Sequence, residues 1–262
     1  MPMLRCRSLL LAALLLAIPA AGAVSIERAT GIGPGTHLLI DMDGQTFGCT
    51  AGWVFRDATS YYLSTAGHCL IPEGTSATHG AGHDAATDSV VRACIDACTF
   101  GGQSGFLLTG TTVALGPVAY ARQSAGGVDI GNDFGLVRIP ASLVPQLRFS
   151  LPGWGIATSA RDMRAGETTC YYGAGAAVGE TFATMARSGV AIGTGADGSW
   201  RMAAPSAVGD SGAAVAICTP GADIAAAGVL THLAAGTIAG TTLGKGAALA
   251  TEAGLHVAPV LQ

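Results

Sequence analysis

The sequence predicts an all-β fold, for three reasons. Glycine makes up 39 of the 262 residues, and glycine weakens helices but suits the tight turns that join short strands. Short segments rich in β-branched or aromatic residues recur along the chain, and Asp, Gly or Ser bounds each of them. Between these segments the sequence shows no long helical periodicity. Strands at this frequency are typical of a barrel or a sandwich.

The strand-like segments form two groups, separated by residues 140–168. The segments are HLLIDM (37–42), GCTAGWVF (48–55), SYYLSTA (60–66), TTVALGPVAYA (111–121), FGLVRI (134–139), CYYGA (170–174), GETFATMA (179–186), VAIGT (190–194), SWRMAA (199–204), AAVAIC (213–218) and IAAAGVLTHLAA (224–235). Residues 140–168 contain prolines and the charged patch RDMRAGE, which is typical of a linker between two halves. Residues 72–105 lose the strand pattern and predict a long surface excursion around one or two short strands. A C-terminal helix over roughly 246–258 is compatible with the sequence.

The first 23 residues have the plan of a secretory signal peptide. Arg5 and Arg7 form a basic head, Leu9–Ile18 an apolar run, and Ala21-Gly22-Ala23 a small-residue cleavage site. The apolar run is shorter than the about 20 residues that cross a bilayer as a helix, although an uncleaved membrane anchor is the alternative. We therefore expect a secreted, extracellular protein without stable membrane insertion. The next residues, 24–36, are polar and rich in Gly and Pro, and predict a flexible N-terminal arm.

Charge and length narrow the classes of partner. Cleavage after Ala23 leaves 239 residues and changes the net charge from −4 to −6. An acidic chain with one lysine, Lys245, is unsuited to nucleic acid or to an anionic membrane. The length suits one large all-β domain or two small barrels that share a core. We expect a monomer that uses no cofactor.

Six cysteines remain after the predicted cleavage: Cys49, Cys69, Cys94, Cys98, Cys170 and Cys218. An even number in an exported chain favours three disulfides, although the sequence alone permits fifteen pairings. His79 and His83 share the spacing of Cys94 and Cys98, so a structural zinc site is an alternative for these four. An exported protein more readily oxidises Cys94 to Cys98 or pairs each with another cysteine. We therefore expect no metal.

Residues 207–214 read AVGDSGAA, and this stretch is either an ordinary turn or a loop that displays Ser211 as a nucleophile. A hydroxyl is a weak nucleophile at neutral pH and needs a general base that a third group orients. Histidine is the usual base. His68 lies in STAGHCL, directly after a strand-like segment and before a cysteine.

Two aspartates compete for the orienting role. Asp133 lies in GNDFGLVRI, at the start of an apolar strand. A carboxylate that enters a buried strand needs hydrogen-bond partners, and an imidazole would be one. Asp129, in GGVDIG, is the rival, and the sequence favours Asp133.

Three motifs resemble those of a known family. TAGHC (65–69), NDFGLV (132–137) and GDSGA (209–213) closely resemble the catalytic motifs of the chymotrypsin/trypsin-like serine peptidases, in the same order of His, Asp and Ser. The match covers most of the chain after residue 23. It implies two antiparallel six-stranded β-barrels, over 37–150 and 151–262, with the active site in the cleft between them.

The resemblance also implies roles for individual residues. Ser211 would attack a peptide carbonyl, His68 would take and return the proton, and Asp133 would orient His68. The backbone N–H groups of Gly209 and Ser211 would form the oxyanion hole. Cysteines fall where the family bridges the histidine loop, at Cys49 and Cys69, and near a bridge in the second barrel, at Cys170 and Cys218. The implied activity is that of a secreted serine endopeptidase acting through an acyl-enzyme.

Two positions depart from the family pattern. Ala213 replaces a glycine, and its methyl group is expected to be tolerated although it crowds the strand after the nucleophile. Asp210 pairs in activated relatives with a new amino terminus, for which no motif exists here, and in many bacterial relatives with an arginine just after the second-barrel cysteine. Tyr171 occupies that place in this chain. The candidate partners are the amino group of Val24, Arg161, Arg164 and Arg201, and we expect that no propeptide cut is needed.

The resemblance also implies the substrate-binding residues, which are carried over from the family by their positions in the sequence. The pocket base is Pro205 followed by Ser206, and the wall strand carries Thr231, His232 and Leu233. The base has no acid, which argues against an Arg or Lys preference, and Leu233 would partly fill a small apolar pocket. His232 would either favour an acidic side chain or, as we favour, pack on the flank of the catalytic histidine.

One alternative function stays open. A protein of the same fold can lose catalysis and serve as a secreted binding or adhesion module. The presence of all three catalytic residues argues against this reading. Ala213, Leu233 and the unassigned partner of Asp210 argue for it.

Overall fold

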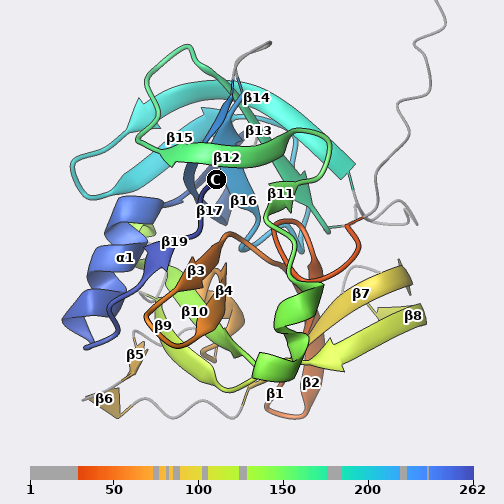
Figure 1. The fold of residues 1–262 in the computed structure, drawn as a ribbon. Helices are drawn as coiled ribbons and strands as arrows, with labels where there is room; N and C mark the ends of the chain where they lie inside the picture. Colours follow the sequence, from red (N-terminus) through yellow and green to blue (C-terminus); the bar gives the residue numbers. More distant parts are fainter. Residues whose placement is uncertain are drawn as a thin grey trace, which may run out of the picture.

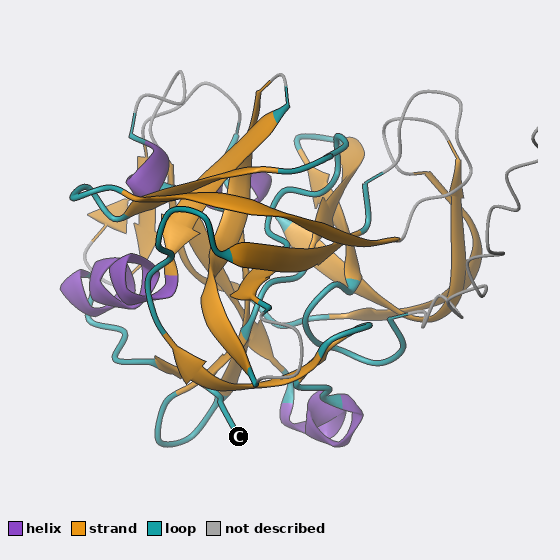
Figure 2. Ribbon diagram, turned by 90° about the horizontal axis from the view of Figure 1, so that it is seen from above, coloured by secondary structure: helices purple, strands orange, loops and turns teal. Residues whose placement is uncertain are grey.

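The computed structural model describes residues 29–72, 77–80, 83–84, 89–101, 106–123, 129–175, 185–218, 223–234 and 236–262, and most of them lie in strands. The predicted all-β, two-barrel fold is confirmed (Figures 1 and 2). The strands are β1 (His37–Met42), β2 (Gln45–Thr50), β3 (Val54–Arg56), β4 (Tyr61–Thr65), β5 (Ala77–Gly80), β6 (His83–Asp84), β7 (Val90–Gly101), β8 (Phe106–Ala114), β9 (Val118–Gln123), β10 (Phe134–Ile139), β11 (Ser150–Leu151), β12 (Gly155–Ala160), β13 (Thr168–Gly173), β14 (Met185–Thr194), β15 (Ser199–Ala203), β16 (Ala214–Ile217), β17 (Ile224–Ala234), β18 (Thr237–Thr242) and β19 (Ala258–Pro259). The helical elements are the 3₁₀ turns η1 (Gly67–Cys69), η3 (Ile130–Asn132) and η4 (Ala141–Gln146) and the α-helix α1 (Leu243–Glu252).

The second half closes on itself. Its strands pair in the order β13-β14-β15-β18-β17-β16, and β16 returns to pair with β13, so that six antiparallel strands form a ring. In Figure 1 these are the cyan and blue strands in the upper part of the molecule. Closure pairs each of the six strands on both sides and encloses an apolar core that includes Trp200 and Met202.

The first half consists of two sheets. One has the order β2-β1-β7-β8, and the other has the order β19-β3-β4-β10-β9-β5-β6. Apolar side chains of both sheets, among them Leu38, Ile40, Leu63 and Val137, pack into one core between them. In Figure 1 these are the orange to yellow-green strands of the lower part, together with the blue β19 from the C-terminal end of the chain.

A third apolar cluster joins the halves. Trp53, Phe55 and Phe134 come from the first half, while Val229 and Leu249 come from β17 and α1. The Trp53 indole N–H also donates to the carbonyl of Gly228 at 3.0 Å. Since such clusters are close-packed, this contact fixes the position of one half against the other.

Several local features differ from the sequence-based expectations. The segment 48–55 is two strands, β2 and β3, separated by residues 51–53, and a Cβ atom at Gly52 would lie 2.4 Å from the Ser64 hydroxyl and 2.8 Å from the Gly212 carbonyl. β7 runs for 12 residues inside the predicted excursion of short strands and pairs with β8 as a long hairpin. The C-terminal helix exists and begins earlier, after the N-cap Thr242, whose hydroxyl accepts from the Lys245 N–H.

The chain ends also differ from the expectations. The described part of the expected flexible arm is held firmly: Ile32 is fully buried, its N–H donates to Gln146 and its carbonyl accepts from Arg148. At the other end, β19 pairs with β3 of the first half. Within the described residues, no helix has the length and apolar character needed to span a bilayer. The expected signal peptide lies outside the described residues.

Candidate active site

His68 lies in the short 3₁₀ turn η1, directly after β4. The next residue, Cys69, forms a disulfide with Cys49 of β2, so the histidine turn is tied covalently to the neighbouring sheet. The His68 side chain is 33% exposed. A base on a rigid, partly open turn is accessible to a reacting group and keeps its position.

Asp133 follows η3 and precedes β10, and its side chain is only 6% exposed. Its carboxylate lies 2.7 Å from His68 Nδ1 and also accepts from the His68 backbone N–H at 3.1 Å. The hydroxyl of Thr241, on β18, donates to the Asp133 carbonyl at 2.7 Å. Of the two aspartates that the sequence offers, Asp133 is therefore the one whose carboxylate reaches His68. It favours the tautomer with the proton on Nδ1 and leaves Nε2 as an acceptor.

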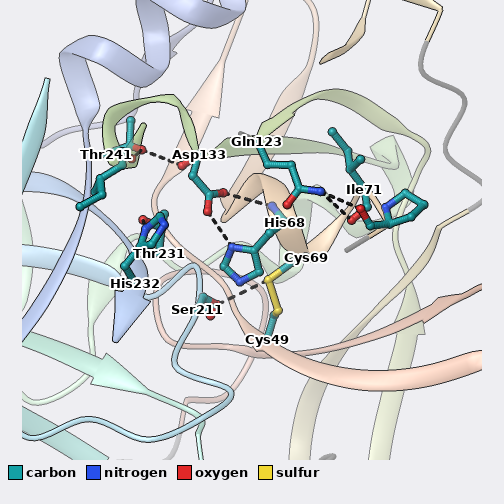
Figure 3. A network of polar contacts seen from close by, with 12 residues as sticks. Cys49, His68, Cys69, Ile71, Gln123, Asp133, Ser211, Thr231, His232 and Thr241 are labelled. Atoms are coloured by element: carbon teal, nitrogen blue, oxygen red, sulfur yellow. Dashed lines mark hydrogen bonds and ion pairs between the residues drawn. A yellow bond between two sulfur atoms is a disulfide. The ribbon is translucent and has the colours of Figure 1, made fainter. Parts of the chain in front are cut away.

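Ser211 lies on the loop between β15 and β16. Figure 3 shows the His68 ring between Asp133 and Ser211, and the Ser211 carbonyl oxygen lies 4.0 Å from the sulfur of Cys69, the neighbour of His68. The structure therefore brings together three residues that are 65 and 78 positions apart in the chain, with the imidazole in the middle.

The loop that carries Ser211 has two glycines, Gly209 and Gly212, in the left-handed region of backbone conformation. Gly209 has a φ of +100°, a conformation that other residues rarely adopt. Within the described residues, neither Gly209 nor Ser211 uses its N–H group in a hydrogen bond. These two N–H groups are the predicted oxyanion-hole donors, and they are unoccupied by protein acceptors in the described part of the chain.

Asp210 has a partner that the sequence did not reveal. Its side chain is fully buried and forms an ion pair with Arg187. It also accepts from the N–H groups of Gly175 at 2.9 Å and Ala207 at 2.8 Å, and the Tyr171 hydroxyl lies 3.2 Å away. Burial raises the pKa of Asp210, and the Arg187 guanidinium and the two N–H donors oppose this rise.

The expected partners of Asp210 were wrong. Arg161 pairs instead with Glu167 at 2.8 Å, and the side chains of Arg164 and Arg201 are exposed, while Val24 lies outside the described residues. Arg187 reaches Asp210 because β13 and β14 pair with Tyr171 directly opposite Arg187. Many bacterial relatives carry the arginine at the position of Tyr171 on β13, whereas here it lies opposite that position, on β14. Only the register between these two strands could have identified Arg187.

Comparisons with known proteins bear on the fold. No protein-family model matches the chain, and no curated protein matches it in sequence. Among solved structures, a thermostable serine protease, AL20, from an extremophilic microorganism matches with a TM-score of 0.54 at 16% identity, over 80% of this chain and 91% of that one. Protease A of Thermobifida fusca matches with a TM-score of 0.46 at 18% identity, over 87% of this chain and 99% of that one.

The first match and the paired barrels decide the fold. This chain has the fold of the chymotrypsin-like serine proteases.

The disulfides suit this chymotrypsin-like fold. Cys49–Cys69 and Cys170–Cys218, the two pairs that the resemblance implies, are present, and the pairing that stayed open is Cys94 with Cys98 within β7. Because the sulfurs of Cys94 and Cys98 are bonded to each other, the alternative of a zinc site that uses these two cysteines is wrong. The described His, Cys, Asp and Glu residues form no group of three that could hold a metal ion.

The departures from the pattern of the chymotrypsin-like fold are accommodated. Ala213 is fully buried in the core of the second barrel, and its N–H donates to the Asp210 carbonyl at 2.9 Å. The methyl group therefore fills core volume beside β16 without interrupting the backbone pairing. The Leu230 N–H, on β17, donates to the Ala213 carbonyl at 2.9 Å.

The predicted substrate-binding residues lie on two segments. Pro205 and Ser206 are exposed on the loop before Ser211. Thr231, His232 and Leu233 lie toward the end of β17, where Leu233 is 38% exposed.

His232 has a defined place next to this wall. Its Nδ1 lies 2.6 Å from the Thr231 hydroxyl, and Figure 3 shows Thr231 and His232 next to Asp133. Burial lowers the pKa of His232, the Asp133 charge acts to raise it, and His68 acts to lower it. Figure 3 shows His232 beside the His68–Asp133 pair, and whether it contacts substrate or packs on the flank of His68 stays a prediction.

Proposed function

We propose that this chain is a secreted serine endopeptidase in which Ser211 is the nucleophile, His68 the general base and Asp133 the orienting acid. One observation carries the proposal: the Asp133 carboxylate lies 2.7 Å from His68 Nδ1, which leaves the opposite edge of the imidazole, with Nε2, on the side of Ser211. The fold supports this reading, since it is that of the chymotrypsin-like proteases.

The proposed reaction has two stages. The Ser211 oxygen attacks the carbonyl carbon of a peptide bond while its proton passes to His68 Nε2, and the Asp133 carboxylate stabilises the imidazolium. The C–N bond then breaks, and His68 returns the proton to the leaving amine, so that an acyl-enzyme remains. A water molecule attacks this ester by the same route and restores the Ser211 hydroxyl.

The N–H groups of Gly209 and Ser211 would stabilise the negative charge of the tetrahedral intermediate. The Arg187–Asp210 pair holds the same loop from inside the second barrel. Because this arginine belongs to the chain itself, we propose that the site assembles without a cut that creates a new amino terminus.

The substrate is proposed to be a peptide or protein chain whose side chain, next to the cut bond, is small and uncharged. Pro205, Ser206, Thr231, His232 and Leu233 would contact it, and none of them carries an acid for an Arg or Lys side chain. The three disulfides support export to an oxidising compartment. We propose a monomer, because every group in the scheme comes from one chain.

A fluorophosphonate probe tests the nucleophile without knowledge of the substrate. We expect labelling of the folded protein that is lost in Ser211→Ala and kept in Ser159→Ala, which removes an exposed hydroxyl on β12. A digest of a mixed peptide library, read by mass spectrometry, would then show which bonds are cut. Absence of labelling in the folded wild-type protein would contradict the proposal and favour the secreted binding module.

A further inference from the structure

One residue of the first barrel contacts the carbonyl groups of both predicted oxyanion residues. We propose that Thr50 is a positioning residue that sets the orientation of the oxyanion hole. The inference rests on the proposed function and adds a component to it, since Thr50 lies at the end of β2 and touches no reacting atom.

The contacts of Thr50 are short and fully buried. Its backbone N–H donates to the Ser211 carbonyl at 2.7 Å, and its hydroxyl donates to the Gly209 carbonyl at 2.7 Å. The same hydroxyl accepts from the Ala174 N–H at 3.0 Å. The Thr50 side chain has no exposed surface, so these bonds do not compete with water.

These bonds restrain the two N–H groups indirectly. The planar peptide ties the Gly209 carbonyl to the Asp210 N–H, and only φ and ψ of Gly209 separate that plane from the Gly209 N–H. Anchoring the carbonyl therefore leaves the Gly209 N–H only these two backbone rotations. Gly209 needs such a restraint most, because glycine at a φ of +100° has low-energy alternatives that other residues lack. With the Thr50 hydroxyl in place, the Gly209 carbonyl is held, and we expect this restraint on φ and ψ of Gly209 to limit how far its N–H can turn from the reacting carbonyl.

Thr50 is itself held from three directions. Its carbonyl accepts from the Thr65 hydroxyl at 3.0 Å, and β1 pairs with it at His37. The preceding residue, Cys49, is bonded to Cys69 beside His68. The same segment therefore connects the turn of the base to the loop of the nucleophile, and sets their relative position across the two barrels.

The test compares four variants with the wild type on one peptide substrate. Thr50→Val removes the hydroxyl at constant shape, and Thr50→Ser and Thr50→Ala differ from each other only by a hydroxyl. Thr169→Val is the matched control, because Thr169 is also fully buried and its hydroxyl has no partner within the described residues.

We expect Thr50→Val and Thr50→Ala to lower kcat by about tenfold or more, with KM within about twofold, since loss of a whole oxyanion donor costs about 10²–10³ in rate. Thr50→Ser should stay within about threefold of the wild type, and Thr169→Val should keep the wild-type kcat. A normal kcat in Thr50→Val, or equal losses in Thr50→Ser and Thr50→Ala, would overturn the proposal. If Thr50→Val does not fold, the Ser and Ala pair decides.

The same samples separate this inference from the proposed function. Fluorophosphonate labelling that is present in the wild type and as fast in Thr50→Ala would refute the role of Thr50 and leave the serine endopeptidase standing. Wild-type protein that is never labelled would refute both. Slow labelling in Thr50→Ala with wild-type rates in Thr169→Val supports both.

Discussion

The two barrels hold their parts of the site in different ways. The first presents His68 on a turn that is one-third exposed, fixed by a disulfide and by Asp133. The second presents Ser211 on a loop whose middle residue, Asp210, is fully buried and paired with an arginine that is 12% exposed. A base that exchanges protons needs access to its reaction partners, whereas a loop that offers backbone N–H groups needs rigidity.

The two barrels also differ in how deeply each buries an Arg–Asp ion pair. Arg92–Asp41 joins β7 and β1 of the first barrel at 3.0 Å, with both side chains about one-third exposed. Arg187–Asp210 is enclosed in the second. Exposed pairs contribute about 0–1 kcal/mol, while removal of one member of an enclosed pair leaves a buried charge and is far more costly. Burial therefore decides which of the two pairs the fold depends on.

The largest expected effect concerns the His68–Asp133 pair of the first barrel. Asp133→Asn should lower kcat by about 10⁴-fold, because an amide in place of the carboxylate stabilises the wrong tautomer of His68. Steady-state kinetics on a peptide substrate measure it, and circular dichroism checks that the fold is kept. Asp129→Asn, the rival aspartate, is the control with expected normal rates. A folded Asp133→Asn enzyme of normal kcat would remove Asp133 from the mechanism.

The next effect tests the second barrel. Arg187→Met should lower the free energy of unfolding by about 3–5 kcal/mol, because Asp210 then carries an unpaired buried charge. Urea unfolding measures the loss, and slower fluorophosphonate labelling should accompany it. Adding Asp210→Asn should recover part of the stability by removing that charge.

The matched control for this substitution is Arg92→Met on the surface pair, for which we expect a loss of about 1 kcal/mol or less. Equal losses in Arg187→Met and Arg92→Met would erase the difference between the two barrels.

A smaller effect depends on pH and again concerns the first barrel. His37 is buried in β1, and burial lowers its pKa to about 4, although the Ala174 carbonyl acts to raise it. In the unfolded chain the His37 imidazole takes up a proton as pH falls below about 6.5, whereas in the folded chain it does so only near pH 4. Stability is therefore fully present above pH 6.5 and should fall by about 3 kcal/mol down to pH 4.

Chemical unfolding of the wild type and His37→Leu between pH 7 and pH 4 measures this contribution. The variant should lose less stability over that range, since its side chain does not titrate. Parallel pH profiles for the two proteins would show that His37 is protonated as easily in the folded chain as in the unfolded one.

Much of the fold was predictable because its signals are local. Strands such as β1 and β10 coincide with apolar segments read directly from the sequence. The TAGHC, NDFGLV and GDSGA motifs point to His68, Asp133 and Ser211 because they resemble the motifs of a known family, and the structure places all three residues close to strand ends. Ile32 was misjudged because its neighbours are Gly and Pro, and only packing against the 146–148 segment buries it.

The sequence by itself determined the all-β class, because turn residues and strand patterns depend on near neighbours, and its three motifs pointed to His68, Asp133 and Ser211 as candidate site residues. Only the tertiary structure decided that Arg187 pairs with Asp210 and that Thr50 holds the loop around Ser211. Both contacts depend on the register of paired strands and on burial between barrels. These quantities are fixed by the packing of residues distant in the chain, and no short stretch of sequence encodes them.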